Sequence, residues 1–430
     1  MIPEGWKSKS FVDVATYRAG RTPARATMAF WANANNGVPW VAISDMTEFG
    51  VVNGTKEKIT QHAFDSVFGR RAVRAGTLLM SFKLTIGRIS TLGVDACHNE
   101  AIIAIYPKPG IDQRFLGYFL SRVDYDALQD RQIKGNTLNQ EKIDRIEIWV
   151  PPLAEQIQIS DILDLIRRAI NLQVCSIKTA VELKRTAMDA LFTRGLRGEA
   201  QKESEIGWIP QSWEVGRLDQ YASVISTRMP YSELENTQTS DEENSVRVLG
   251  IKVGDMNRPG NEVGLHHAGL ERFLPKRVAD RYCAPPKTII FPKRGAAIAT
   301  NKKRISYEWT VFDPNVIGII ACEKLDQNYL FQWFQGFDLR TITEPGPTPQ
   351  LNKKNLDPLV IPVPPQLSEQ RDIASVLECI DRKIDLHRRK RAMLDSLFQT
   401  LLRRLMTGEL RVDQLDLSAL SSVAQSEAAA

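Results

Sequence analysis

The sequence predicts an α+β fold in which two strand-rich globular domains stand in tandem and each is followed by a long α-helix. Three observations lead to this prediction: an internal repeat of about 210 residues, a proline pair that closes each strand-rich part, and an uninterrupted helical stretch after each pair. We place the first domain at residues 1–150, its helix at 151–200, the second domain at 205–361, its helix at 362–410 and a disordered tail at 411–430.

The internal repeat is visible in five blocks whose offsets stay between 207 and 214 residues. The paired blocks are residues 2–6 with 209–213, 41–46 with 250–256, 77–80 with 288–291, 115–119 with 329–333, and 149–152 with 362–365. Between these blocks the two halves differ greatly in sequence. The pattern indicates one architecture that is used twice with divergent loops.

Each half begins with short β-type runs separated by glycine, proline and asparagine, which is typical of a strand-rich domain with long loops. The predicted strands are 40–43, 77–82 and 101–106 in the first half, and 246–251, 288–291 and 316–321 in the second. One amphipathic helix is expected in each half, at 114–128 and at 328–337. A Pro-Pro pair then ends each domain, because proline cannot donate to a strand ladder.

Neither 154–194 nor 367–407 contains proline or glycine, so each is predicted to form one helix about 60 Å long. Apolar residues recur in both at alternating steps of four and three, the 3.5-residue period of coiled coils. Helices of this length need a partner, and pairing with each other is the simplest solution. The expected core residues are Leu163, Ile166, Ile170, Ile177, Leu377, Ile380, Ile384, Leu394, Phe398 and Leu401, and in the first helix Val174 and Val181 extend the seam.

Searches for catalytic motifs find none: there is no phosphate-binding P-loop, no dinucleotide-binding glycine motif, no Pro-Asp nuclease motif and no methyltransferase Asn/Asp-Pro-Pro-aromatic motif. His266 and His267 are expected to be a surface pair rather than a metal site. His387 falls on the helix seam, where packing or solvation is expected. The cluster 97–100, Cys-His-Asn-Glu, has a counterpart at 312–315 without Cys or His. We therefore expect no catalytic residue and no metal ligand.

The five cysteines are odd in number and form no Cys-x-x-Cys pair, which indicates a reducing compartment. Neither a signal-peptide core nor a stretch of about 18 apolar residues is present. The expectation is a soluble cytoplasmic protein without a membrane partner.

The net charge of only +5 hides two local excesses of basic residues. Residues 66–94 contain five bases and no acid, and residues 246–312 contain 13 bases against five acids. Bases beside Gly/Asn-rich loops can neutralise phosphates and contact guanine edges, although a solvated surface is the alternative for either cluster alone. The expected DNA contacts are Arg70, Arg71, Arg74, Lys83 and Arg88, and Lys252, Arg258, Lys293, Arg294, Lys302, Lys303 and Arg304. The basic run 387–391 lies within a helix, where a solvated face or a protein contact is favoured.

The ordered motifs resemble the specificity subunit of type I restriction-modification systems over residues 2 to about 410. These motifs are Gly-Arg-Thr-Pro at 20–23, Pro-Trp-Val-Ala-Ile-Ser-Asp-Met at 39–46, Gly-Thr-Leu-Leu at 76–79, Thr-Ile-Gly-Arg at 85–88, Gly-Asn-Thr at 135–137, a Pro-Pro-x-x-Glu-Gln helix start at 151–156, and the Leu-Phe and Gly-Glu helix ends. Thr85 joins the expected DNA contacts through this resemblance. At the place equivalent to 20–23 the second half lacks Gly-x-Thr-Pro, and it has Ala-Ala-Ile-Ala at 296–299 in place of Thr-Ile-Gly-Arg.

The resemblance implies two target-recognition domains that each read half of a split, asymmetric site in double-stranded DNA. It implies that the helices pack as an antiparallel coiled coil with pseudo-twofold symmetry and dock two methyltransferase subunits and, through them, restriction/translocase subunits. Adenine methylation and DNA cleavage, with S-adenosylmethionine, ATP and Mg, would belong to those partners, so this chain would bind no cofactor. The alternative is a coiled-coil scaffold whose domains bind protein or carbohydrate.

Overall fold

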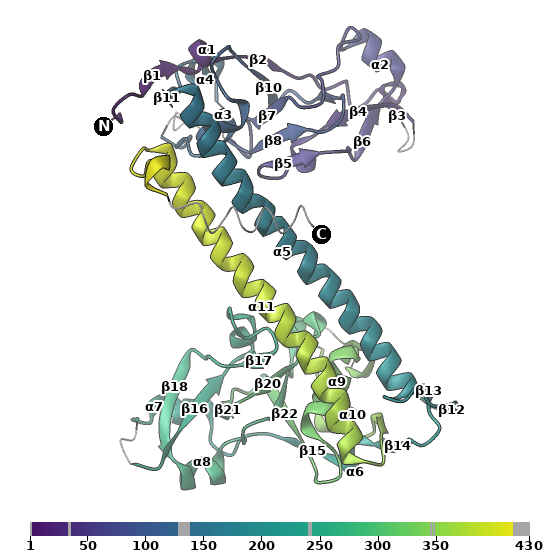
Figure 1. Cartoon of the computed structure of the whole chain (residues 1–430). Helices are drawn as coiled ribbons and strands as arrows, with labels where there is room; N and C mark the ends of the chain where they lie inside the picture. Colours follow the sequence, from purple (N-terminus) through teal and green to yellow (C-terminus); the bar gives the residue numbers. More distant parts are fainter. Residues whose placement is uncertain are drawn as a thin grey trace. The chain divides into compact units, whose positions relative to one another are not determined.

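The computed structural model describes residues 2–32, 36–127, 138–239, 243–344, 346 and 349–415. It divides into two compact units, Met1–Leu172 with Arg391–Ala430, and Gln173–Lys390. Each unit holds one strand-rich domain and portions of both long helices (Figure 1). The expected tail at 411–430 is described only to residue 415, and the motif at 135–137 lies outside the described residues.

The first domain contains a five-stranded and a four-stranded sheet, and a strand pair joins its entry to its exit. Its strands are β1 Lys7–Ser10, β2 Ala15–Ala19, β3 Trp31–Ala32, β4 Val38–Val41, β5 Gly50–Val52, β6 Glu57–Ile59, β7 Leu78–Ser81, β8 Ile89–Leu92, β9 Cys97–His98, β10 Ile102–Pro107 and β11 Glu147–Val150. Its helices are α1 Phe11–Val14, α2 Gln61–Ser66, α3 Gln113–Leu120 and α4 Gln140–Asp144, with 3-10 turns η1 Met28–Phe30 and η2 Ile43–Asp45. The sheet orders are β2-β10-β7-β8-β5 and β3-β6-β4-β9, and β1 pairs with β11.

The second domain repeats this plan, with a three-stranded sheet, β18-β16-β21, in place of the four-stranded one. Its strands are β14 Glu214–Arg217, β15 Ala222–Ile225, β16 Ser245–Ile251, β17 Gly264–Leu265, β18 Leu270–Pro275, β19 Ile289–Pro292, β20 Arg304–Ser306, β21 Trp309–Phe312, β22 Val316–Ala321 and β23 Val360–Val363. Its helices are α6 Leu218–Tyr221, α7 Tyr231–Asn236, α8 Lys276–Tyr282, α9 Gln327–Gly336 and α10 Lys353–Leu356, with η3 Val253–Asn257, η4 Gly295–Thr300 and η5 Leu339–Ile342. The five-stranded sheet, β15-β22-β19-β20-β17, has its strands in equivalent places to the first, and β14 pairs with β23 as β1 does with β11.

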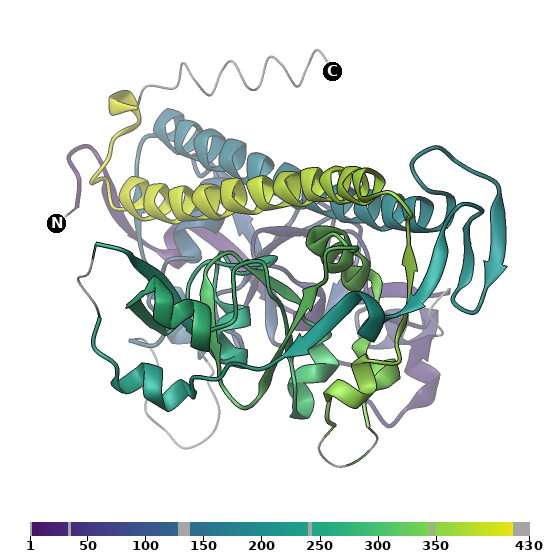
Figure 2. The ribbon, with the colours of Figure 1, turned by 90° about the horizontal axis from the view of Figure 1, so that it is seen from below.

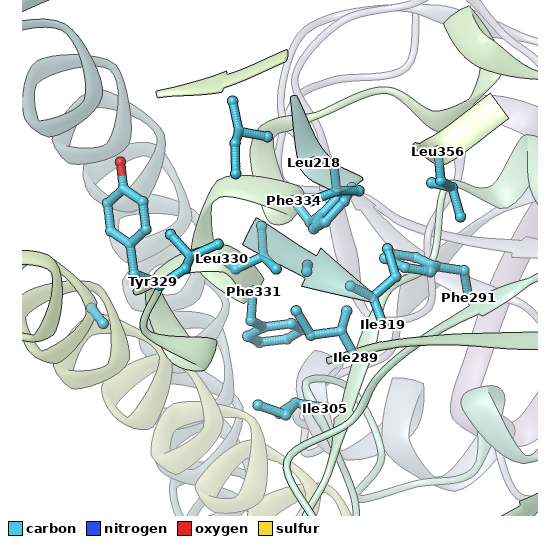
Figure 3. Packing of buried hydrophobic residues seen from close by; sticks show 14 of the residues in the cluster. Leu218, Ile289, Phe291, Ile305, Ile319, Tyr329, Leu330, Phe331, Phe334 and Leu356 are labelled. Atoms are coloured by element: carbon cyan, nitrogen blue, oxygen red, sulfur yellow. The ribbon is translucent and has the colours of Figure 1, made fainter. Parts of the chain in front are cut away.

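Both domains bury their amphipathic helix against the five-stranded sheet. In the second unit Phe331 and Phe334 of α9 pack with Ile289 and Phe291 of β19 and Ile319 of β22 (Figure 3). In the first unit Leu116 and Leu120 of α3 belong to the core of β7 and β10. The predicted helix at 114–128 ends at Leu120, eight residues early, because the chain turns back and buries Tyr125, whose hydroxyl donates to the Leu120 carbonyl oxygen at 2.8 Å.

The long helices are α5 Leu153–Arg194 and α11 Leu367–Met406, and η6 Val412–Gln414 follows α11. In the first unit the start of α5 packs against the end of α11, through Leu163 and Ile166 with Phe398 and Leu402. In the second unit the end of α5 packs against the start of α11, through Leu191 with Leu377. The helices therefore pack antiparallel, which confirms the predicted coiled coil of a tandem α+β architecture.

A hairpin of β12 Gln201–Ser204 and β13 Gly207–Pro210 projects beyond the end of α5 and leads into the second domain (Figure 2). Among the described residues no helix is long and apolar enough to cross a membrane.

Candidate nucleic-acid interface

A buried glutamine attaches each domain to its long helix. The Gln156 amide accepts from the Asp112 N–H (2.8 Å) and donates to the carbonyl oxygens of Gly110 and Pro151 (3.1 and 2.9 Å). The Gln370 amide repeats all three bonds, accepting from the Asp326 N–H (2.6 Å) and donating to Lys324 and Pro364 (3.3 and 2.9 Å). Both glutamines are buried, so their amides cannot bond to water, and these hydrogen bonds satisfy them instead. The Glu-Gln pair that follows each Pro-Pro pair thus joins the loop before α3 or α9 to the start of the long helix of the same half, α5 Leu153–Arg194 or α11 Leu367–Met406.

Two of the five bases in the acid-free stretch of the first domain pair with the acids at its two edges. Arg70 makes a two-pronged bond to Asp65 (3.0 Å for each N–O pair), and Arg74 pairs with Asp95 at 2.7 Å. Arg71 is exposed. Exposed pairs of this kind contribute about 0–1 kcal/mol, so a phosphate can replace the carboxylate at small cost. The three arginines remain predicted DNA contacts.

The other predicted residues of the first domain lie in the loop between β7 and β8. Thr85 is exposed, and Lys83 is half-buried with its ammonium group 5.5 Å from the centre of the Phe82 ring. The Arg88 guanidinium donates to the carbonyl oxygens of Ile43 and Met46 at 3.2 and 3.3 Å. Thr85 and Arg88 line one groove of about 560 Å³ with Met46 and Thr47. Arg88 therefore supports the groove wall, and Thr85 is the more exposed of the two groove residues.

In the second domain the fold brings together two lysines that are 41 residues apart. Lys252 follows β16 and Lys293 follows β19, and both line a groove of about 460 Å³ that Tyr231 also lines. The Lys252 ammonium group lies 4.4 Å from the centre of the Tyr231 ring. Arg294 is exposed next to Lys293, and Arg258 pairs with Asp255 at 2.6 Å. A groove with two lysines and an aromatic side chain suits a phosphate backbone.

The predictions that Lys303 and Arg304 contact DNA are wrong, because both side chains point into the second domain. Lys303 is 2% exposed and donates to the Phe337 carbonyl oxygen at 2.5 Å. Arg304 is 9% exposed and donates to the Met256 carbonyl oxygen at 2.9 Å. Their neighbour Lys302 is half-buried and bonds to the Asn257 side chain. Lys303 immediately precedes β20 and Arg304 is its first residue. Both side chains donate to backbone carbonyl oxygens inside the domain, so neither presents its charge to a phosphate.

Replacing Lys303 by methionine is expected to raise the free energy of unfolding at pH 7 by about 1–3 kcal/mol. Burial lowers the pKa of Lys303 to about 8, so between pH 8 and about 10.4 the unfolded chain binds more protons than the folded one. Wild-type stability should rise with pH across this window, and the variant should lose that rise. Urea titrations at several pH values measure both effects, with Lys302→Met, at the half-buried neighbouring lysine, as the control. Weaker DNA binding without a gain in stability would contradict the structural role.

A family model described as "Type I restriction modification DNA specificity domain" matches residues 3–183 and 210–395. The chain belongs to this family. Two curated relatives from Methanocaldococcus jannaschii are the type I restriction enzyme MjaIX specificity subunit, 25% identical over 438 aligned positions, and the MjaVIII specificity subunit, 26% identical over 442; each alignment covers 96% of this chain and 95% of the relative.

Solved structures of this class share the fold. The crystal structure of a type I restriction-modification system S subunit from M. genitalium is 12% identical, with a TM-score of 0.60 over 94% of this chain and 96% of that one. A chain from a study of complex assembly and conformational transition in the type I R-M system is 18% identical, with a TM-score of 0.52 over 95% and 100%. The resemblance deduced from the ordered motifs is confirmed.

The residues that sequence reasoning set aside have structural roles in this specificity-subunit fold. Cys97 and His98 form β9 and are buried, which raises the pKa of the thiol to about 12 and lowers that of the imidazole to about 4. Neither a thiolate nor an imidazolium is therefore available there at pH 7. His266 and His267 are exposed, and His266 stacks on Tyr307 at 5.1 Å. Among the described residues no group of three or more His, Cys, Asp or Glu side chains is placed to hold a metal ion.

Sequence reasoning missed the polar centre of the coiled coil. Val174 and Val181, expected in the seam, are 42% and 45% exposed, whereas Gln173 and Ala180 are buried. The His387 Nδ1–H donates to the Gln173 Oε1 at 2.8 Å, and Lys184 pairs with Asp381 at 2.7 Å. The seam therefore passes one residue before each valine. The remaining predicted core positions are buried or half-buried.

Proposed function

We propose that this chain reads a bipartite, asymmetric site in double-stranded DNA, one half-site per domain. The observation that carries the proposal is the use of one sheet order twice, with different basic loops after the equivalent strands β7 and β19. Two domains of the same fold that carry different loops at the same place are suited to reading two different half-sites. Family membership supports the same reading.

We further propose that the long helices dock two methyltransferase subunits and, through them, restriction/translocase subunits. Adenine methylation and cleavage then belong to the partners, together with S-adenosylmethionine, ATP and Mg. Apolar side chains on the outer faces of both helices support docking: Leu172 and Leu183 of α5 are 49% and 54% exposed, and Leu386 and Met393 of α11 are 64% and 73% exposed. Side chains of this kind, next to charged neighbours, are suited to a protein interface.

Methylation-motif sequencing of the native host, with and without this chain, tests the function. One split adenine-methylation motif should disappear when the chain is removed, and affinity purification of the chain should recover a methyltransferase. An unchanged set of methylated motifs, or recovery of other proteins without a methyltransferase, would favour the scaffold alternative.

Replacing Lys293 and Arg294 by alanine should weaken DNA binding by the assembled complex. The slope of log K against log [salt] should become shallower by about two, because two phosphate contacts are lost. Fluorescence anisotropy over a series of salt concentrations measures this slope. Arg217→Ala with Lys353→Ala is the matched control, since both side chains are exposed, neither lines the groove, and they pair with Asp219 and Asp357. Equal slopes for the two double variants would remove Lys293 and Arg294 from the interface.

A further inference from the structure

The loop from Phe82 to Arg88, between β7 and β8, holds a large apolar side chain in solvent. Leu84 is 76% exposed, and its backbone φ is 64°. Bulky L-residues rarely adopt this left-handed conformation, and their presence there indicates that something other than local preference selects them. Leu84 therefore combines an unfavourable backbone conformation with a side chain that is largely unpacked.

Hydrogen bonds hold the base of this loop, so the tip is kept in a defined position. The Phe82 N–H donates to the Ala101 carbonyl oxygen at 2.9 Å, and the Gly87 N–H donates to that of Ser81 at 2.8 Å. The Ser81 hydroxyl accepts from the Arg88 N–H at 3.2 Å and donates to the Thr85 carbonyl oxygen. These bonds fix both ends of the tip Lys83–Thr85.

The second domain shows what the fold itself requires at this point. β19 occupies the place of β7 in the five-stranded sheet, and the residue four positions after Phe291 is Gly295, as Leu84 is four after Met80. Gly295 has φ 74°, the same left-handed conformation. Glycine adopts it without strain. The fold thus needs a left-handed backbone at this position but no side chain. The first domain nevertheless has leucine here, although this conformation is unfavourable for it.

We propose that Leu84 is a specificity-determining residue that makes an apolar contact with the 5-methyl group of a thymine in the half-site read by the first domain. The inference rests on the proposed DNA-reading function. Its neighbours, Lys83 and the exposed Thr85, are suited to the phosphates and polar base edges around such a contact. In the major groove the thymine methyl is the apolar group that distinguishes one base from the others, and an exposed leucine is complementary to it.

A mutant cycle between protein and DNA tests the contact. The full chain, in complex with its methyltransferase partner, is titrated with DNA of its own motif in which each thymine in turn is replaced by deoxyuridine, which lacks only the methyl group. At one position in the first half-site, wild type should lose about fourfold in affinity, the equivalent of one buried methyl group. Leu84→Gly should lose a similar factor on unmodified DNA and be insensitive to deoxyuridine at that position. Leu84→Met, which keeps an apolar side chain, should retain most of the discrimination.

Thermal unfolding separates this role from a structural one. Leu84→Gly removes the strain, so its melting temperature should not fall; a clear fall would assign the leucine to folding and overturn the proposal. Equal weakening on all DNA sequences, additive effects in the cycle, or loss of methyltransferase assembly would also overturn it. Val51→Ala, a change at a 58% exposed apolar residue of the same domain, is the control and should leave every reading unchanged. If wild type itself shows no preference for its motif, the proposed function fails rather than the contact.

Discussion

Replacing Asp381 by leucine should destabilise the second unit by about 3–5 kcal/mol, because the Lys184 ammonium group would stay buried without its partner. The two side chains are each 13% exposed, and the Lys184 Nζ lies 2.7 Å from both carboxylate oxygens of Asp381. Gln332 of α9, fully buried, also donates to this carboxylate at 2.9 Å. Asp381 therefore joins α5, α11 and the second domain at one point, and its loss leaves two donors unpaired.

The double replacement Lys184→Met with Asp381→Leu should recover most of the lost stability, since no charge is then buried. Urea unfolding of the wild type, both single variants and the double variant gives the coupling energy. Asp385→Leu is the control: its partner Arg389 is 70% exposed, so the change should cost no more than about 1 kcal/mol. A double variant as unstable as Asp381→Leu would show that the cost comes from packing and not from the unpaired charge.

The two long helices show how much of a structure can be predicted from an apolar repeat in the sequence. Both could be predicted from the absence of proline and glycine and from the 3.5-residue repeat, because these signals are local. The prediction that Val174 and Val181 lie in the seam is wrong, because the residues in the seam there, Gln173, Ala180 and Lys184, are polar or small and do not continue the apolar pattern. Gln173 and Lys184 are kept inside by His387 and Asp381, about 200 residues away in the sequence. A single-helix pattern cannot reveal a partner on another helix.

The proposed DNA interface could be predicted only in part for a related reason: the sequence gives the charge of a side chain but not its direction. The stretch 66–94 contains no acid, but Asp65 and Asp95, which bound it, fold back onto Arg70 and Arg74. In 302–304 three consecutive bases look alike in sequence, but the side chains of the last two are buried. The groove that joins Lys252 and Lys293 depends on strand order, which loops of unlike sequence do not reveal.

If the chain reads the bipartite site proposed above, deleting one heptad from each long helix at facing positions should shorten the non-specific spacer between the two half-sites and leave the half-sites unchanged. Residues 174–180 of α5, with the facing seven residues of α11, are suitable, because neither helix is interrupted there. Seven residues correspond to about 10 Å of helix, or about three base pairs. A heptad is also within about 20° of two full turns, so each apolar face keeps its direction.

Methylation-motif sequencing of a host that carries the shortened chain measures the spacer directly. The control replaces the same heptads with unrelated sequence that keeps the apolar seam, so that composition changes and length does not; its spacer should equal that of the wild type. The helices act as a ruler only if length alone moves the half-sites. New half-site bases with the old spacer would show that the domains read DNA independently of the distance that α5 and α11 impose.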